Sequence, residues 1–170
     1  PIRPVIAVSG AVTRTDGPMS GGLAPVVDDP TFGDAAEVYA ALVQGTRDYA
    51  RTNGFTDIVL GLSGGIDSLL CTAIAASAIG AEQVHAIALP SRYSTDHSIS
   101  DSEKLCANLG IDLSEIAIEP AFAAMLDMLA PTFEGTEPDV TEENLQGRIR
   151  ANLLMAMANK FRGWLVVICG

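Results

Sequence analysis

The sequence is poor in cysteine and lacks any long apolar run. Its three cysteines, Cys71, Cys106 and Cys169, lie far apart and form no C-x-x-C pair, which argues against a zinc site or a redox pair. No apolar stretch approaches the length of a membrane span, and the N-terminus shows no basic-then-apolar signal pattern. We therefore expect a cytoplasmic location and no membrane partner.

Basic residues are also scarce. The 170 residues contain 10 Lys and Arg against 21 Asp and Glu, so the formal net charge is -11. Such an acidic surface repels nucleic-acid backbones and anionic membranes, and we expect neither as a partner. An anionic nucleotide could still bind, provided that backbone amides, a metal ion or a few placed arginines offset its charge.

Two regions differ in composition. Residues 1–33 are rich in Gly, Pro, Ser, Thr and Asp, which is typical of loops and turns. We interpret them as a linker or the tail of an upstream module, with at most one short strand at residues 5–8. Residues 34–170 show regular patterning, and the 48% of hydrophobic residues in the chain suffice for a core.

Apolar runs and helical patterns alternate from residue 34 onward. The pattern predicts strands at 58–60, 84–89, 116–118 and 164–168, and helices at 34–53, 69–79, 100–110, 120–129 and 141–160. Ser100 is the predicted cap of the helix at 100–110, and Thr141 is the predicted cap of the helix at 141–160. The alternation predicts an α/β fold in which helices cover both faces of a parallel sheet. Ligands of such folds bind at the carboxyl ends of the strands, so the loops at 61–68 and 90–98 and the segment after Ile168 become candidates.

The loop at 61–68 reads Gly-Leu-Ser-Gly-Gly-Ile-Asp-Ser and joins a predicted strand to a helix. Its glycines permit close approach to the backbone, and amides entering a helix form an anion-binding concavity. The carboxylate of Asp67 would repel a phosphate unless Mg²⁺ bridged the two. The alternative is a plain turn capped by Ser and Asp. The loop matches neither a Walker motif nor the G-x-G-x-x-G of dinucleotide enzymes.

Asn144 and Arg148 are four residues apart on the predicted long helix, so they share one face. Arginine suits phosphate or carboxylate ligands because of its fork of donors. Spacing alone favours the alternative, a solvated polar face.

Three segments carry a resemblance to a known family. Residues 63–68 (Ser-Gly-Gly-Ile-Asp-Ser) are similar to the pyrophosphate loop of the N-type ATP pyrophosphatases. Residues 89–94 (Leu-Pro-Ser-Arg-Tyr-Ser) and 141–150 (Thr-Glu-Glu-Asn-Leu-Gln-Gly-Arg-Ile-Arg) resemble segments of glutamine-dependent NAD synthetases. The resemblance covers about residues 34–168. It implies an adenine nucleotide alpha hydrolase-like fold and an ATP-pyrophosphatase (NAD synthetase) domain at 34–170.

The resemblance also implies an activity, a ligase that amidates deamido-NAD with ATP through an adenylate and needs no nucleophilic side chain. It implies ATP and Mg²⁺ as cofactors, Asp67 as the magnesium ligand, Asn144 and Arg148 as contacts of deamido-NAD, and a homo-oligomer supplied with ammonia or glutamine. The residues that it assigns to ATP are Gly61, Leu62, Ser63, Gly64, Gly65, Ile66, Asp67, Ser68, Leu89, Arg92 and Cys169.

The sequence departs from the family at its end. The family continues with T-T-G-N-K-S-E after the final strand, whereas this chain ends at Ile168-Cys169-Gly170, with Cys169 in place of a threonine. A glutaminase module, which the resemblance leads us to expect upstream, is not among residues 1–33. We therefore expect a domain truncated at its C-terminus and inactive alone.

Two rival hypotheses stay open. One is a sibling in the superfamily, such as a GMP synthetase or a tRNA-thiolating enzyme, although the acidic charge disfavours tRNA and residues 143–146 favour NAD synthetase. The other is a non-catalytic nucleotide-binding domain.

Overall fold

The computed structural model of the protein describes residues 34–94 and 96–169. The predicted linker at residues 1–33, including its short strand, lies outside these ranges. Within them the strands form one four-stranded sheet in the order β3-β2-β1-β4. The strands are β1 (Asp57–Leu62), β2 (Val84–Ala88), β3 (Leu113–Glu115) and β4 (Trp164–Val167). Every pairing is parallel, as the sequence predicted.

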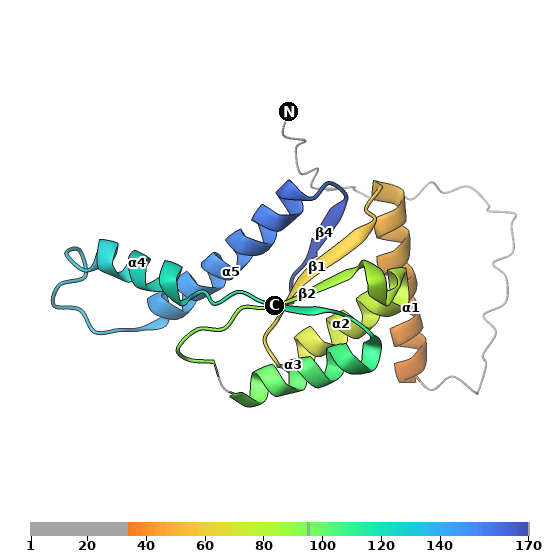
Figure 1. The fold of residues 1–170 in the computed structure, drawn as a ribbon, viewed down its shortest axis with the longest axis horizontal. Helices are drawn as coiled ribbons and strands as arrows, with labels where there is room; N and C mark the ends of the chain where they lie inside the picture. Colours follow the sequence, from red (N-terminus) through yellow and green to blue (C-terminus); the bar gives the residue numbers. More distant parts are fainter. Residues whose placement is uncertain (1–33, 95, 170) are drawn as a thin grey trace, which may run out of the picture. The chain divides into compact units, whose positions relative to one another are not determined.

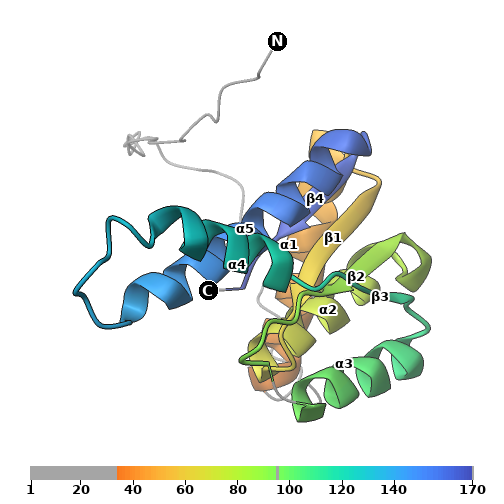
Figure 2. The same cartoon turned by 60° about the vertical axis from the view of Figure 1, so that its left-hand side comes forward.

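Helices cover both faces of this sheet (Figure 1). They are α1 (Asp34–Asn53), α2 (Ile66–Ile79), α3 (Asp96–Leu109), α4 (Glu119–Leu129) and α5 (Val140–Lys160), with a short 3-10 turn, η1, at Ala81–Gln83. The helices α2 and α3 lie on one face, and α4 and α5 lie together on the other (Figure 2). The predicted fold class is therefore confirmed.

The apolar run in β1 explains this layering. Ile58, Val59 and Leu60 are all fully buried. Successive side chains of a strand point to opposite faces, so the burial of all three requires helices on both faces of the sheet. Ile58 and Leu60 pack with α2 and α3, whereas Val59 packs with Phe122 of α4 and Ile149 of α5. Each such buried side chain contributes about 1.5–3 kcal/mol relative to an exposed one. A strand buried on both faces holds the centre of the sheet in place.

The first helix, α1, packs on α2. Tyr39 Oη lies 2.8 Å from Ser77 Oγ, and Arg47 Nε donates to the carbonyl oxygen of Ala78 at 2.8 Å. The apolar residues whose spacing indicated this helix, among them Val38 and Leu42, are themselves exposed. Their spacing correctly indicated a helix, but hydrogen bonds from polar side chains of α1 contribute much of its contact with α2.

Both predicted helix caps are wrong. Helix α3 begins at Asp96, so Ser100 lies inside it. The prediction failed because a Ser-x-x-Glu pattern is compatible with a helix interior as well as with a cap. Helix α5 is capped by Asp139, whose Oδ1 accepts from the Thr141 amide at 2.7 Å. Glu142 closes the capping box by accepting from the Asp139 amide at 2.7 Å. The hydrogen bond from Thr141 lowers the pKa of Asp139.

The predicted strand at 116–118 is displaced. The observed strand β3 is Leu113–Glu115, and it pairs with the end of β2. The apolar residues that suggested the strand follow it, and their amides continue the pairing: Ile116 N donates to Ala88 O and Ile118 N to Pro90 O, both at 2.9 Å. Pairing with β2, more than hydrophobicity, therefore decides where this edge strand begins.

Candidate functional site

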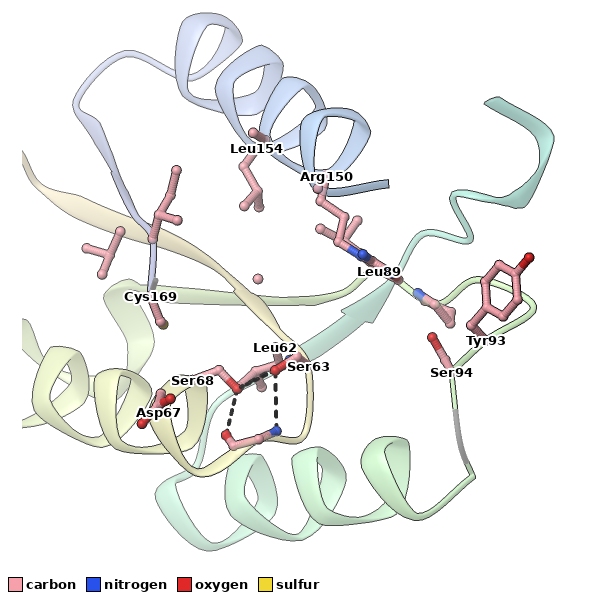
Figure 3. Close-up of a pocket in the computed structure, with 17 residues that line it drawn as sticks. Leu62, Ser63, Asp67, Ser68, Leu89, Tyr93, Ser94, Arg150, Leu154 and Cys169 are labelled. Carbon is pink, nitrogen blue, oxygen red and sulfur yellow. Dashed lines mark hydrogen bonds between the residues drawn. The ribbon is translucent and has the colours of Figure 1, made fainter. Parts of the chain in front are cut away.

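The strand order places a crevice at the carboxyl ends of β1 and β4. The chain runs outward from β1 to β2 and β3 on one side and returns to the other side at β4, and ligands of open α/β sheets bind at such a switch point. A cavity of about 540 Å³ lies there (Figure 3). The predicted ATP-binding residues that line it are Gly61, Leu62, Ser63, Gly65, Asp67, Ser68, Leu89 and Cys169. The fold therefore gathers most of the predicted nucleotide site around one cavity.

The turn between β1 and α2 presents backbone amides. Gly64 has a φ of +78°, in the left-handed region that glycine tolerates at little cost. Gly65 is the N-cap of α2, and no side chain caps this helix end within the described residues. The first amides of α2 therefore remain available to an anion, and the helix dipole favours negative charge there.

Two serine hydroxyls hold this turn in shape (Figure 3). Ser68 Oγ donates to Gly65 O at 2.9 Å and lies 3.2 Å from Ser63 Oγ. Ser63 Oγ in turn accepts from the Gly65 amide at 3.3 Å, and Ser68 Oγ accepts from the Ser63 amide at 3.3 Å. Ser68 is buried, whereas Gly65 is exposed. The hydroxyls thus fix the turn while its glycine edge faces the cavity.

Asp67 lies in the first turn of α2, is exposed and lines the cavity. It makes no ion pair within the described residues, which also contain no group of three or more His, Cys, Asp or Glu suited to a metal ion. A single free carboxylate fits Mg²⁺, because this ion commonly takes one or two carboxylates and completes its shell with phosphate oxygens and water. The donor set is therefore compatible with magnesium that arrives together with a phosphate ligand.

Cys169 lies in the cavity wall beside Cys71 of α2. Burial, a hydrogen bond with Cys71 and the charges of Cys71 and Asp67 raise the pKa of the Cys169 thiol to about 11. The side chain is therefore a neutral thiol at physiological pH. It adds no negative charge to a wall that would face phosphates.

A hydrogen-bond network connects α5 to the end of β2. Arg150 Nε donates to Leu89 O at 3.0 Å, and Ser91 Oγ donates to Gln146 Oε1 at 2.7 Å. Gln146 is buried, and Arg150 lines the cavity, where burial lowers the pKa of its guanidinium. Sequence reasoning missed both. The available signal was their i, i+4 spacing beside the apolar stripe that contains Ile149.

Three predicted residues do not line this cavity. Gly64 shapes the turn, Ile66 is 75% exposed, and Arg92 points elsewhere. Arg92 Nε donates to Glu119 Oε1 at 2.8 Å, and its guanidinium lies 5.6 Å from the Phe122 ring centre. The hydrogen bond from Arg92 lowers the pKa of Glu119. Arg92 therefore forms an ion pair in this structure and is not part of the cavity.

The predicted deamido-NAD residues lie beside the cavity. Asn144 and Arg148 are exposed on α5 and line a shallow depression of about 460 Å³. Its wall shares Gly147, Arg150 and Ala151 with the cavity. Two adjacent depressions therefore meet along one side of α5.

The amino end of the sheet has a different character. His85 Nε2 lies 2.9 Å from Asp57 Oδ1, and Thr56 Oγ1 donates to Asp57 Oδ2 at 2.6 Å. The His85 ring stacks on Trp164 at 3.8 Å between centroids, and Phe161 stacks on Trp164 at 4.5 Å. The polar groups named here bond with one another, and the aromatic rings stack beside them.

None of the helices that the structure describes is long and apolar enough to cross a membrane.

Known proteins are similar to this chain in sequence and in fold. The chain matches the NAD synthase family over residues 38–169. It is 49% identical over 151 residues to a glutamine-dependent NAD(+) synthetase of Thermotoga maritima, covering 89% of this chain and 26% of the relative. A homologous enzyme of the same name from Xylella fastidiosa is 52% identical over 131 residues, covering 77% of this chain and 24% of the relative.

A solved structure agrees with these relatives. The glutamine-dependent NAD+ synthetase of Acinetobacter baumannii in complex with ADP superimposes with a TM-score of 0.79 and 42% identity, covering 82% of this chain and 26% of that one. The chain thus spans about a quarter of the length of the relatives it matches. On its sequence and its fold, this chain belongs to the NAD synthase family.

Proposed function

We propose that the whole protein converts deamido-NAD to NAD by ATP-dependent amidation and that this chain supplies its ATP site. The observation that carries the proposal is the cavity at the switch point, where a glycine turn, uncapped amides of α2 and the free carboxylate of Asp67 meet. The membership of the NAD synthase family supports it. The relative from A. baumannii was solved with ADP, which supports a nucleotide in the same fold.

In the proposed reaction, a carboxylate oxygen of deamido-NAD attacks the α-phosphorus of ATP. An oxygen–phosphorus bond forms, the bond from the α-phosphorus to the bridging oxygen breaks, and pyrophosphate leaves with the electron pair. Ammonia then attacks the acyl carbon of the adenylate, AMP departs, and the ammonium proton passes to solvent. No side-chain nucleophile is needed, so the task of this chain is to position the substrates and to stabilise charge.

The turn at 61–68 is suited to the leaving pyrophosphate. The first turn of α2 has no side-chain cap and lies at the cavity wall, so its amides are available to a phosphate, and the hydroxyls of Ser63 and Ser68 lie in the same turn. Mg²⁺ held by Asp67 would neutralise the pyrophosphate charge when it is bound. Cys169 and Leu89 would line the remainder of the nucleotide site.

The second substrate is assigned to the neighbouring depression. Asn144 and Arg148 lie there with exposed side chains, and an arginine fork suits the phosphates of a dinucleotide. The names of the relatives support glutamine as the source of ammonia in the whole protein. A cytoplasmic homo-oligomer without nucleic-acid or membrane partners remains our prediction.

One assay separates this proposal from its rivals. The full-length protein is supplied with ATP, Mg²⁺, deamido-NAD and ammonia, or with glutamine in place of ammonia, and pyrophosphate and NAD are measured. We expect both products in equal amounts. Pyrophosphate without NAD would indicate a sibling enzyme with another acceptor, and nucleotide binding without either product would indicate a non-catalytic domain.

A further inference from the structure

Arg150 stands where the two depressions meet. The cavity and the shallow depression share Gly147, Arg150 and Ala151, and Arg150 is the charged member of this set. If ATP occupies the first depression and a carboxylate substrate the second, their reacting ends must meet near this shared wall. The charge found at that wall therefore bears directly on the step that joins them.

The bonding of Arg150 leaves part of its guanidinium free. Nε donates to Leu89 O at 3.0 Å, and Nη2 makes a long contact of 3.5 Å with Gln146 Oε1. A guanidinium carries five N–H donors, so several remain. Within the described residues Arg150 has no carboxylate partner, although the chain contains 21 Asp and Glu. A partly buried cation without a counter-ion is suited to an anionic ligand.

The position of Arg150 complements the turn after β1. Figure 3 shows its side chain extending from α5 across the cavity from Ser63 and Ser68. The turn and Asp67 are suited to the pyrophosphate end of the nucleotide. The charge on the opposite wall is therefore placed to meet a different part of the ligand.

We propose that Arg150 binds the α-phosphate of ATP and, through it, the adenylate, at the point where the carboxylate of the second substrate attacks. This inference rests on the proposed function. The attack brings two anions together, and a fixed guanidinium beside them offsets their repulsion. It also stabilises the negative charge on the oxygens of the α-phosphate in the transition state. Its bond to Leu89 O holds the guanidinium in position before the substrates arrive.

The competing explanation is purely structural, namely that Arg150 only holds the Leu89 carbonyl in place. Two variants separate these roles. Arg150→Gln retains an N–H donor near Leu89 but loses the charge, whereas Arg150→Lys retains the charge but loses the fork. Arg47→Gln is the matched control, because Arg47 Nε also donates to a backbone carbonyl, that of Ala78, but lines neither depression.

The test measures binding of AMP, adenosine and magnesium pyrophosphate to the full-length protein by calorimetry. We expect Arg150→Gln to weaken AMP about tenfold, the loss of a charge-assisted hydrogen bond, with adenosine and pyrophosphate unchanged. Arg150→Lys should weaken AMP less, about threefold, because an ammonium is a point charge. Arg47→Gln should change none of the three affinities.

The outcomes that contradict the proposal are distinct. Equal losses for AMP and adenosine would show that Arg150 only shapes the adenosine wall, and an unchanged AMP affinity would remove it from the phosphate site. If Arg150→Gln does not fold, the same comparison of AMP with adenosine in Arg150→Lys decides the matter. Wild-type protein that binds none of the three ligands would instead contradict the proposed function itself.

Discussion

The central strand β1 begins at Asp57, and the turn that follows it leads to Asp67; the two aspartates differ in their partners and in their exposure. Asp57, at the amino end, bonds with His85 and Thr56 beside a stack that contains Trp164. Asp67, beyond the carboxyl end, is exposed and has no ion pair within the described residues. The Asp57 carboxylate is therefore satisfied by neighbours within the chain, whereas the Asp67 carboxylate has no ion-pair partner among the described residues.

This contrast separates stability from function within one sheet. A carboxylate that is paired in the folded state contributes to folding, whereas one that is kept free contributes nothing until a partner arrives. The glycines follow the same division. Gly54 and Gly64 both have positive φ, yet Gly54 only leads into β1 while Gly64 shapes the turn beside the cavity.

The largest expected effect comes from replacing each of the two aspartates by asparagine. Asp67→Asn should lower magnesium-dependent pyrophosphate release by the full-length enzyme by about 100-fold or more, because the metal-bound charge at the leaving group is lost. The melting temperature should remain near that of the wild type. Asp57→Asn is the matched control and should leave the turnover unchanged. Similar turnover in both variants would remove the functional distinction between the two ends.

The second effect concerns the two glycines. Gly64→Ala and Gly54→Ala should each reduce the free energy of unfolding by about 1–2 kcal/mol, since an alanine is strained at positive φ. Denaturant titration measures this loss. Only Gly64→Ala should also weaken the binding of magnesium pyrophosphate, because only that turn faces the cavity. Equal binding losses would indicate a general loosening of the sheet in place of a local effect.

The third effect is the pH dependence of the paired aspartate. Burial raises the pKa of Asp57, but the hydrogen bonds from Thr56 and His85 and the charge of His85 outweigh it and lower the pKa below 3.8. The folded state therefore favours the carboxylate, and its contribution, up to about 1 kcal/mol, is complete above about pH 4. It is lost as the pH falls through the lowered folded pKa.

Urea titrations between pH 5 and pH 2 check this third effect. The difference in unfolding free energy between wild type and Asp57→Asn should shrink as the pH falls. A difference that stays constant over this range would show that the Asp57–His85 contact carries no charge-dependent stability.

The smallest effect is spectroscopic. The chain contains one tryptophan, Trp164, and its indole stacks on His85 at the amino end. His85→Gln should change the emission of Trp164 in this chain, because the stacked imidazole is removed. Adding ADP with Mg²⁺ should leave the emission unchanged, since the proposed nucleotide site lies at the other end of the sheet. A nucleotide-induced change would show that the two ends are coupled.

Sequence reasoning was strongest where local chemistry decides the structure. The strand β1 and the turn at 61–68 were predicted because apolar runs and glycines dictate their conformations regardless of distant contacts. The same holds for α5, which was predicted at residues 141–160 and is observed at Val140–Lys160. The cavity could be located in advance because parallel strands share one carboxyl edge.

The remaining features depend on partners far away in the sequence. The pairing of Arg92 with Glu119 joins residues 27 positions apart, and the bond from Arg150 to Leu89 spans 61 positions. No periodicity within one element reveals such contacts. Arg92 was assigned to ATP on the family resemblance alone, an assignment that stays a prediction, and Arg150 was not singled out. The short edge strand β3 was displaced for the same reason, because its position depends on β2.

The mutual bonds of Ser63 and Ser68 have a kinetic consequence. Because these hydroxyls brace the turn through bonds within the chain itself, a phosphate bound there as proposed would need only the rotation of two O–H bonds and the displacement of solvent. Little backbone entropy remains to be lost on association. Capture of the nucleotide should therefore proceed at a rate set by diffusion and charge, without a slow rearrangement of the chain.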